Sequence, residues 1–154
     1  MIFFGAESGS DWVLRQMNKQ LEAKQTLELV HRLRDFGIIP EFSFVVGNPE
    51  DPERDVEEGI AFIREIKRLT PDSEIVLQHY RPTPQRASMY GDIDGKVQFL
   101  TSPEEWATPR WQSFVTGVDT KMPWLPDRVK HRVDDFELVV SSRWPTLQDI
   151  RTPG

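Results

Sequence analysis

Residues suited to binding a small ligand follow three short apolar runs in the first half of the chain. The segments are G-A-E-S-G-S from residue 5, G-N-P-E-D-P from residue 47 and Y-R-P-T-P from residue 80. Glycines let a ligand approach the backbone closely, and a carboxylate such as that of Glu7 accepts hydrogen bonds from a diol such as ribose. We therefore expect a polar or anionic small molecule to bind near these segments. The nearest residues are Glu7, Ser8, Gly47, Asn48 and Arg81.

Neighbouring side chains add two further contacts to this expected site. Val45 and Val46 offer an apolar edge to a flat base, and Lys19 and Arg81 can meet a carboxylate. Structural interpretations stay open beside these. Glu7 can interact with the N-terminus of the following helix, residues 47–49 can form a plain turn, and the two cations can be surface charges.

The three histidines do not predict a metal centre. Their spacing matches no zinc site, and the chain has no cysteine. His79 lies next to a strand end, where it either borders the ligand or has a structural role.

The order of the elements brings the three segments to one edge of a sheet. Apolar runs at residues 2–4, 38–46 and 75–77 predict strands, and apolar residues at helical spacing predict helices at 24–36 and 52–69. This alternation is typical of βαβ units with a parallel sheet. Ligands of such sheets and barrels lie at the carboxyl ends of the strands. The predicted site is therefore at that edge.

Residues 85–154 have a different character, being rich in Trp, Pro and charge. Ser102 begins S-P-E-E, a capping box that predicts a helix to about residue 118. Asp127 is expected to start another helix, whose end is open because F-E-L-V-V also suits a strand. We expect a mostly helical C-terminal extension with a short tail from Trp144.

Composition narrows the possible partners. The chain has 154 residues, a formal net charge of -6 and no cysteine. The acidic balance argues against nucleic acid or a membrane surface as a partner, because binding to either needs clustered cations. No apolar run is long enough to cross a bilayer, and the N-terminus lacks the features of a signal peptide, so we expect a cytoplasmic location. The chain opens directly on an apolar strand, and we expect it to be a fragment lacking its upstream half.

Three stretches resemble radical S-adenosylmethionine (radical SAM) enzymes. They are GAESGSDWVLRQMNK, FGIIPEFSFVVGNPED and IVLQHYRPTP, which look like the fourth, fifth and sixth strand regions of that family's TIM-like barrel. The resemblance implies an α/β fold, with residues 1–84 forming a partial (βα) barrel of three parallel strands before the helical extension at 85–154. The extension resembles those of the branch that often carries an upstream cobalamin-binding domain.

The resemblance also implies a cofactor site. Such enzymes use S-adenosylmethionine (SAM) and a [4Fe-4S] cluster held by a CxxxCxxC loop, and they generate a 5′-deoxyadenosyl radical or transfer a methyl group. This chain departs from the pattern because it has no cysteine, so we expect it to be inactive alone and to need the missing N-terminal half as its partner. The implied cofactor-binding residues are Glu7 and Ser8 at the ribose, Lys19 at the SAM carboxylate, Val45, Val46 and Gly47 at the adenine, and His79 and Tyr80 bordering the adenine.

Two other functions remain open. One is a non-catalytic module that binds a nucleotide or phosphate at the same edge, and the other is a piece of a different βα-barrel enzyme. The substrate is expected to be a small molecule of unknown identity. An exposed edge on the first strand would favour self-association of the fragment.

Overall fold

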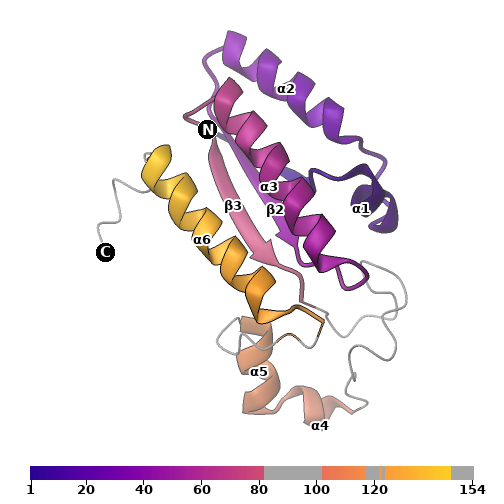
Figure 1. Ribbon diagram of the computed structural model, residues 1–154. Coiled ribbons are helices and arrows are strands. Elements are labelled where there is room, and N and C mark those ends of the chain that lie inside the picture. The colour runs from indigo at the N-terminus through magenta and orange to yellow at the C-terminus, as the bar shows by residue number, and fades with distance from the viewer. Residues whose placement is uncertain (82–101, 117–121, 123, 147–154) are drawn as a thin grey trace.

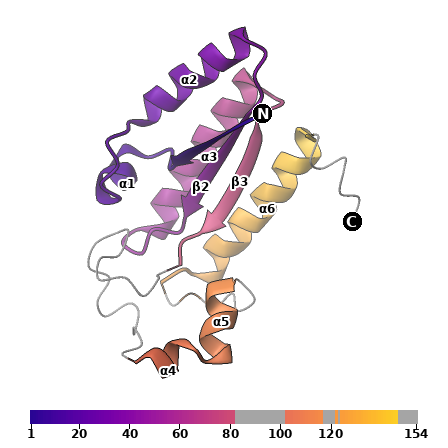
Figure 2. The same cartoon turned by 180° about the vertical axis from the view of Figure 1, so that it is seen from behind.

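The computed structural model describes residues 1–81, 102–116, 122 and 124–146 of the protein. Three strands, β1 (Ile2–Glu7), β2 (Pro40–Val46) and β3 (Glu74–His79), form one parallel sheet in the order β1-β2-β3. The helices are α1 (Asp11–Gln16), α2 (Ala23–Asp35), α3 (Pro52–Leu69), α4 (Pro103–Trp106), α5 (Pro109–Thr116) and α6 (Asp127–Arg143). Figure 1 shows α2, α3 and α6 beside the strands, and Figure 2 shows the same layers from behind.

The predicted fold class is confirmed: the strands are parallel, lie in sequence order and precede a mostly helical C-terminal region. Right-handed crossovers place α2 and α3 on the same face of the sheet. The register aligns Phe4 with Phe42 and Phe42 with Ile75. These three side chains therefore share a face, because side chains alternate along a strand.

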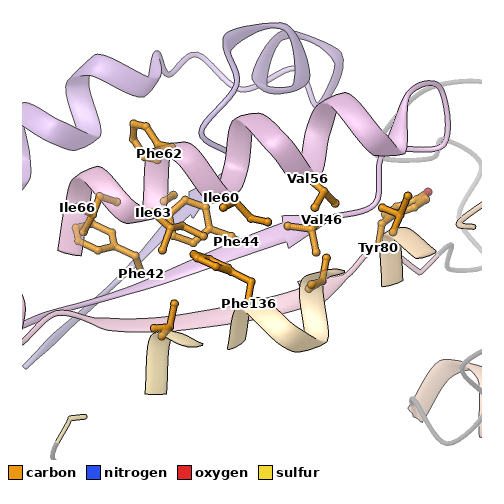
Figure 3. Close-up of a cluster of buried hydrophobic side chains, with 14 of the residues drawn as sticks. Phe42, Phe44, Val46, Val56, Ile60, Phe62, Ile63, Ile66, Tyr80 and Phe136 are labelled. Carbon is orange, nitrogen blue, oxygen red and sulfur yellow. The ribbon is translucent and has the colours of Figure 1, made fainter. Parts of the chain in front are cut away.

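The helix-covered face of the sheet holds the hydrophobic core. Side chains of β2 point into a cluster with those of α3 and α6, as Figure 3 shows. Its labelled members include Phe42, Phe44, Val46, Ile60, Ile63 and Phe136. The apolar stripe predicted for α3 is thus buried against the strand whose inward positions are aromatic or branched. This packing fixes the direction of the strand ends.

The opposite face of the sheet is open in the part of the chain that the structure describes. Phe3 is 62% exposed on this face, and Gly5 and Gln78 are exposed as well. No described helix lies on this side of the strands in either view (Figures 1 and 2). In a closed barrel this face would point to the interior.

Helix α6 packs in the same core as the sheet. Its buried stripe is Val129, Val133, Phe136 and Val140, as the helical spacing predicts. Ion pairs join it to α3: Arg132 Nε lies 2.6 Å from Glu57 Oε1, and Arg128 pairs with Glu53. The F-E-L-V-V stretch is helical, so the strand alternative is wrong. The last described helix is therefore part of the α/β layer rather than a separate body.

The helix predicted from Ser102 is two shorter ones. The capping box is present, since Ser102 Oγ accepts from the Glu105 N–H at 3.2 Å and the Glu105 carboxylate accepts from the Ser102 N–H at 3.1 Å. The helix then breaks before Pro109, because proline has no N–H and disfavours helical geometry in the residue before it. The predicted end at residues 117–118 and the tail from 147 lie outside the described residues.

Local capping features mark the start of α3 and the end of α2. Asp51 Oδ1 accepts from the Arg54 N–H at 3.1 Å at the start of α3, and Gly37 takes a φ of 64° just after α2. Phe36, the last residue of the predicted helix at 24–36, is 80% exposed. It follows the last helical residue, where the chain turns away from the core.

Candidate functional site

Glu7 ends β1 in a conformation that sets its direction. Its φ of 64° is in the left-handed region, which is uncommon for a residue with a side chain. A bulge between Gly5 and Glu7 brings Glu7 opposite Phe44, out of the regular alternation. Glu7 Oε1 lies 2.9 Å from the place that a Cβ on Gly5 would occupy. The carboxylate therefore lies over the open face, in the space beside Gly5 that a side chain at position 5 would enter.

Lys19 meets this carboxylate from the loop after α1. Its Nζ lies 2.9 Å from Glu7 Oε1, and both side chains are partly exposed. A Schellman motif directs the chain there: the Asn18 N–H donates to the Arg15 carbonyl at 3.0 Å and the Lys19 N–H to the Leu14 carbonyl at 2.9 Å. Asn18 has the left-handed φ, 55°, that this motif requires. Local helix geometry thus places a cation next to the strand-end carboxylate.

Val45 lies on the same open face, on the strand next to β1. It is half-buried and pairs in register with Gln78. Val46, the next residue, points the opposite way into the core and is 6% exposed (Figure 3). Of the predicted residues, Glu7 and Lys19 are therefore in contact, Val45 lies on the same face of the neighbouring strand, and Val46 contacts the core.

His79 and Tyr80 face the helices. His79 pairs in register with Val46, and its Nε2 lies 3.7 Å from Asp134 Oδ1 on α6. Burial lowers the pKa of His79, although Asp134 opposes this, so the imidazole is neutral at neutral pH. Tyr80 is 4% exposed, with its ring centroid 5.9 Å from that of Trp124. Both side chains are packed away from Glu7, and their role at an adenine stays a prediction.

The second half of the G-A-E-S-G-S segment packs against α3. Ser8 is buried and its Oγ accepts from the Ser10 N–H at 3.1 Å, while Ser10 Oγ donates to Glu58 of α3. A Cβ on Gly9 would lie 2.3 Å from the Phe62 Cβ. Glycine at position 9 therefore serves the contact between this turn and α3, and not the approach of a ligand.

This contact leads to a stability prediction. Gly9→Ala is expected to lower the unfolding free energy by about 1–3 kcal/mol, because the turn must move away from Phe62. Gly59→Ala is the matched control: nothing lies within 4 Å of its Cβ position on α3, and helix propensity favours Ala by about 1 kcal/mol. Urea unfolding of both variants checks this, and equal stability of Gly9→Ala and the unchanged chain would contradict it.

The segment after β2 is held by its own side chains. Asp55 Oδ2 accepts from the Gly47 N–H at 2.8 Å and from the Asn48 N–H at 2.9 Å. Burial raises the pKa of Asp55 to about 6, and the two N–H bonds oppose that rise. These two amides are therefore occupied and do not face a ligand. No sequence pattern predicts that Asp55 points inward, since acidic residues in a first helical turn are ordinarily solvated.

A side-chain bridge joins the loops that follow β1 and β2. Asn48 is fully buried, and its Nδ2 donates to Gln16 Oε1 at 2.5 Å. Gln16 Nε2 in turn donates to Glu50, whose N–H donates to Asn48 Oδ1 at 2.8 Å. Asn48 lies in a segment predicted to form the site, whereas no pattern in the sequence points to Gln16, which lies on α1. The bridge fixes the spacing of the two strand ends that present Glu7 and Val45.

Two kinds of feature are absent among the described residues. No group of three or more His, Asp or Glu side chains there is placed to hold a metal ion. No helix in this part of the chain is long and apolar enough to cross a membrane.

Curated proteins with related sequences match less than half of the chain. A ribosomal protein uS12 methylthiotransferase RimO of Thermosipho melanesiensis is 33% identical over 63 residues, which are 40% of this chain and 15% of that protein. A tRNA-2-methylthio-N(6)-dimethylallyladenosine synthase of Clostridium botulinum is 34% identical over 70 residues, or 43% of this chain and 15% of that protein. An uncharacterized methyltransferase of Pyrococcus horikoshii is 29% identical over 65 residues, or 42% and 14%.

The chain thus spans about 15% of the length of these relatives. No protein-family model matches it, and no solved structure matches it significantly. The similarities support the resemblance to radical SAM enzymes at the level of the superfamily.

Proposed function

We propose that this chain is part of a radical SAM enzyme and supplies the ribose and adenine side of the SAM site. The observation that carries the proposal is the Glu7–Lys19 pair on the open face at the carboxyl edge of the sheet. Val45 presents an apolar surface on the neighbouring strand. A nucleoside with a charged tail needs these three kinds of contact: an acceptor for its hydroxyls, a cation for its carboxylate and an apolar edge for its base.

Three features of the site support the proposal of such a ligand. The Glu7 carboxylate is only partly covered, so a ribose diol can reach it, and charge-assisted hydrogen bonds are among the stronger polar contacts. Lys19 is 40% exposed at its side chain and faces the same space. Gly5 leaves the sheet surface beneath the carboxylate free of a side chain.

The catalytic cluster would be held elsewhere. A [4Fe-4S] cluster with bound SAM supplies a 5′-deoxyadenosyl radical in such enzymes, and its thiolate ligands cannot come from residues 1–154, which include no cysteine. We propose that the cluster belongs to an N-terminal half that pairs with the edge of β1, which no strand among the described residues covers, and faces the open side of the sheet. Without that half, the same edge favours self-association.

The test is the effect of Glu7 on SAM binding. Glu7→Ala is expected to weaken SAM binding by roughly tenfold or more, because two charge-assisted hydrogen bonds are lost. Calorimetric titration of the chain with SAM measures this, with a weak baseline because the methionine end lacks the cluster. Glu41→Ala is the matched control, since Glu41 lies on the same face at the amino end of β2.

The outcomes separate the proposal from its alternatives. Unchanged affinity in a folded Glu7→Ala variant would make Glu7 purely structural. Titration with adenosine and with inorganic phosphate distinguishes the other functions: a chain that binds phosphate but neither SAM nor adenosine is a phosphate-binding module. Binding of SAM that fails in both Glu7→Ala and Glu41→Ala would place the ligand elsewhere on the face.

A further inference from the structure

We infer that Trp124 is a positioning residue that fixes the end of β2, the edge proposed to contact adenine. This inference deepens the proposed function and rests on it. Trp124 lies outside the three polar segments that follow the strands. It belongs to the C-terminal region, 77 residues from the glycine that it contacts.

Gly47 is held from two sides. Its N–H donates to Asp55 Oδ2 at 2.8 Å, and its carbonyl accepts from Trp124 Nε1 at 3.1 Å. Gly47 has a φ of 92°, and Leu125 Cδ1 lies 3.5 Å from its Cβ position. Gly47 is therefore bound by α3 through its N–H and by the segment that precedes α6 through its carbonyl.

The indole also contacts the end of the neighbouring strand. Its ring centroid is 5.9 Å from that of Tyr80, whose N–H donates to the Val46 carbonyl at 2.7 Å. Trp124 is 7% exposed and belongs to the core cluster. A single buried side chain thus ties together the residues that follow β2 and β3.

This arrangement determines where Val45 lies. Val45 is two residues before Gly47, and the strand cannot shift or twist at its end without breaking the bond to Trp124 or the bond to Asp55. Val46, between them, points into the core and gives no freedom either. Through Trp124, the C-terminal region therefore helps to set the position of Val45 on the open face.

Trp124→Phe removes the N–H donor together with the five-membered ring of the indole, and it keeps a benzene ring beside Tyr80. The chain is compared with Trp124→Phe, Trp124→Ala and Trp106→Phe. Trp106 is the matched control, since its ring packs on Trp111 at 4.3 Å between α4 and α5. The two readouts are hydrogen exchange of single amides and SAM affinity by calorimetry.

In Trp124→Phe, the Gly47 and Asn48 amides are expected to exchange about three- to tenfold faster, the range for loss of one buried hydrogen bond. The Phe42 amide in the middle of β2 should exchange at an unchanged rate. SAM binding should weaken by a similar factor of about three to ten. Trp106→Phe should change neither readout.

Three outcomes would overturn the inference. Unchanged exchange at Gly47 and Asn48 in Trp124→Phe overturns the inference, whatever happens to SAM. Faster exchange with unchanged SAM affinity also overturns it, because the strand end would then not matter for the ligand. Uniformly faster exchange throughout β2 would show a general structural role and overturn it too. If SAM binding by the unchanged chain is too weak to measure, the exchange data alone decide whether Trp124 holds the strand end.

Discussion

The Asp55→Asn variant is expected to gain about 2–3 kcal/mol of unfolding free energy relative to the unchanged chain as the pH rises from about 4 to about 7. Asp55 is 1% exposed, and Oδ2 accepts from both the Gly47 and the Asn48 N–H groups. An asparagine oxygen in the same place accepts both bonds without a buried charge. The variant therefore keeps the loop and loses the titration.

The sign follows from the pKa of Asp55. Burial raises it from 3.8 to about 6, the Asn48 and Gly47 N–H groups oppose the rise, and the charges of Glu58 and Asp51 add to it. The unfolded chain therefore loses this proton at a lower pH than the folded protein does. The stability that the protonated group contributes is complete below about pH 3.8 and is lost as the pH rises through about 6.

Urea unfolding at several pH values between about 4 and 7 measures the difference between the two proteins. Asp55→Ala is the second variant, and it should be less stable at every pH because both buried N–H groups lose their acceptor. Parallel curves of unfolding free energy against pH for Asp55→Asn and the unchanged chain would show that burial does not raise the pKa of the Asp55 carboxyl.

Lys67→Ala is expected to lower the unfolding free energy by about 2–5 kcal/mol. Lys67 is fully buried, and its Nζ donates to the Pro71 carbonyl at 3.0 Å and to the Ser73 carbonyl at 2.5 Å. It thereby holds the turn between α3 and β3, where Ser73 Oγ also donates to the Thr70 carbonyl at 2.8 Å. Truncation leaves two carbonyls without this donor and opens a cavity beside them.

Two further variants separate these causes. Lys67→Met fills most of the volume but offers no donor, so it should recover the part of the loss that is due to the cavity. Arg68→Ala, at the exposed neighbouring position, should change stability by about 0.5 kcal/mol or less. Thermal or urea unfolding measures these changes in unfolding free energy. If Lys67→Ala loses no more stability than Arg68→Ala does, Lys67 does not stabilise the fold.

The sequence by itself determined the order and type of the elements. The helical spacing in residues 52–69 is a local signal that the structure confirms, and the cap at Asp51 and the turn at Gly37 are local features too. Because right-handed crossovers put successive strands in parallel, these signals also placed the three polar segments at one edge. Composition alone likewise determines that residues 1–154 offer no thiolate ligands to an iron–sulfur cluster.

Tertiary structure decided which residues of each segment face the open side. The bulge at Glu7 sends its carboxylate over Gly5, whereas Gly9 packs on Phe62, although both glycines looked alike in the sequence. Val46 and His79 point to the helices because the register of the strands fixes their side. Alternation along a strand predicts two faces, but only the packing of the helices shows which of them is covered.

The contacts that hold the strand ends join residues that are far apart in the chain. Ser10 and Glu58 are 48 residues apart, and Gly47 and Trp124 are 77 residues apart. Propensity, capping and periodicity act over a few residues, so they predict where a helix or strand begins and ends. They carry no information on which distant side chain fills the space beside it, because that depends on how all the elements pack together.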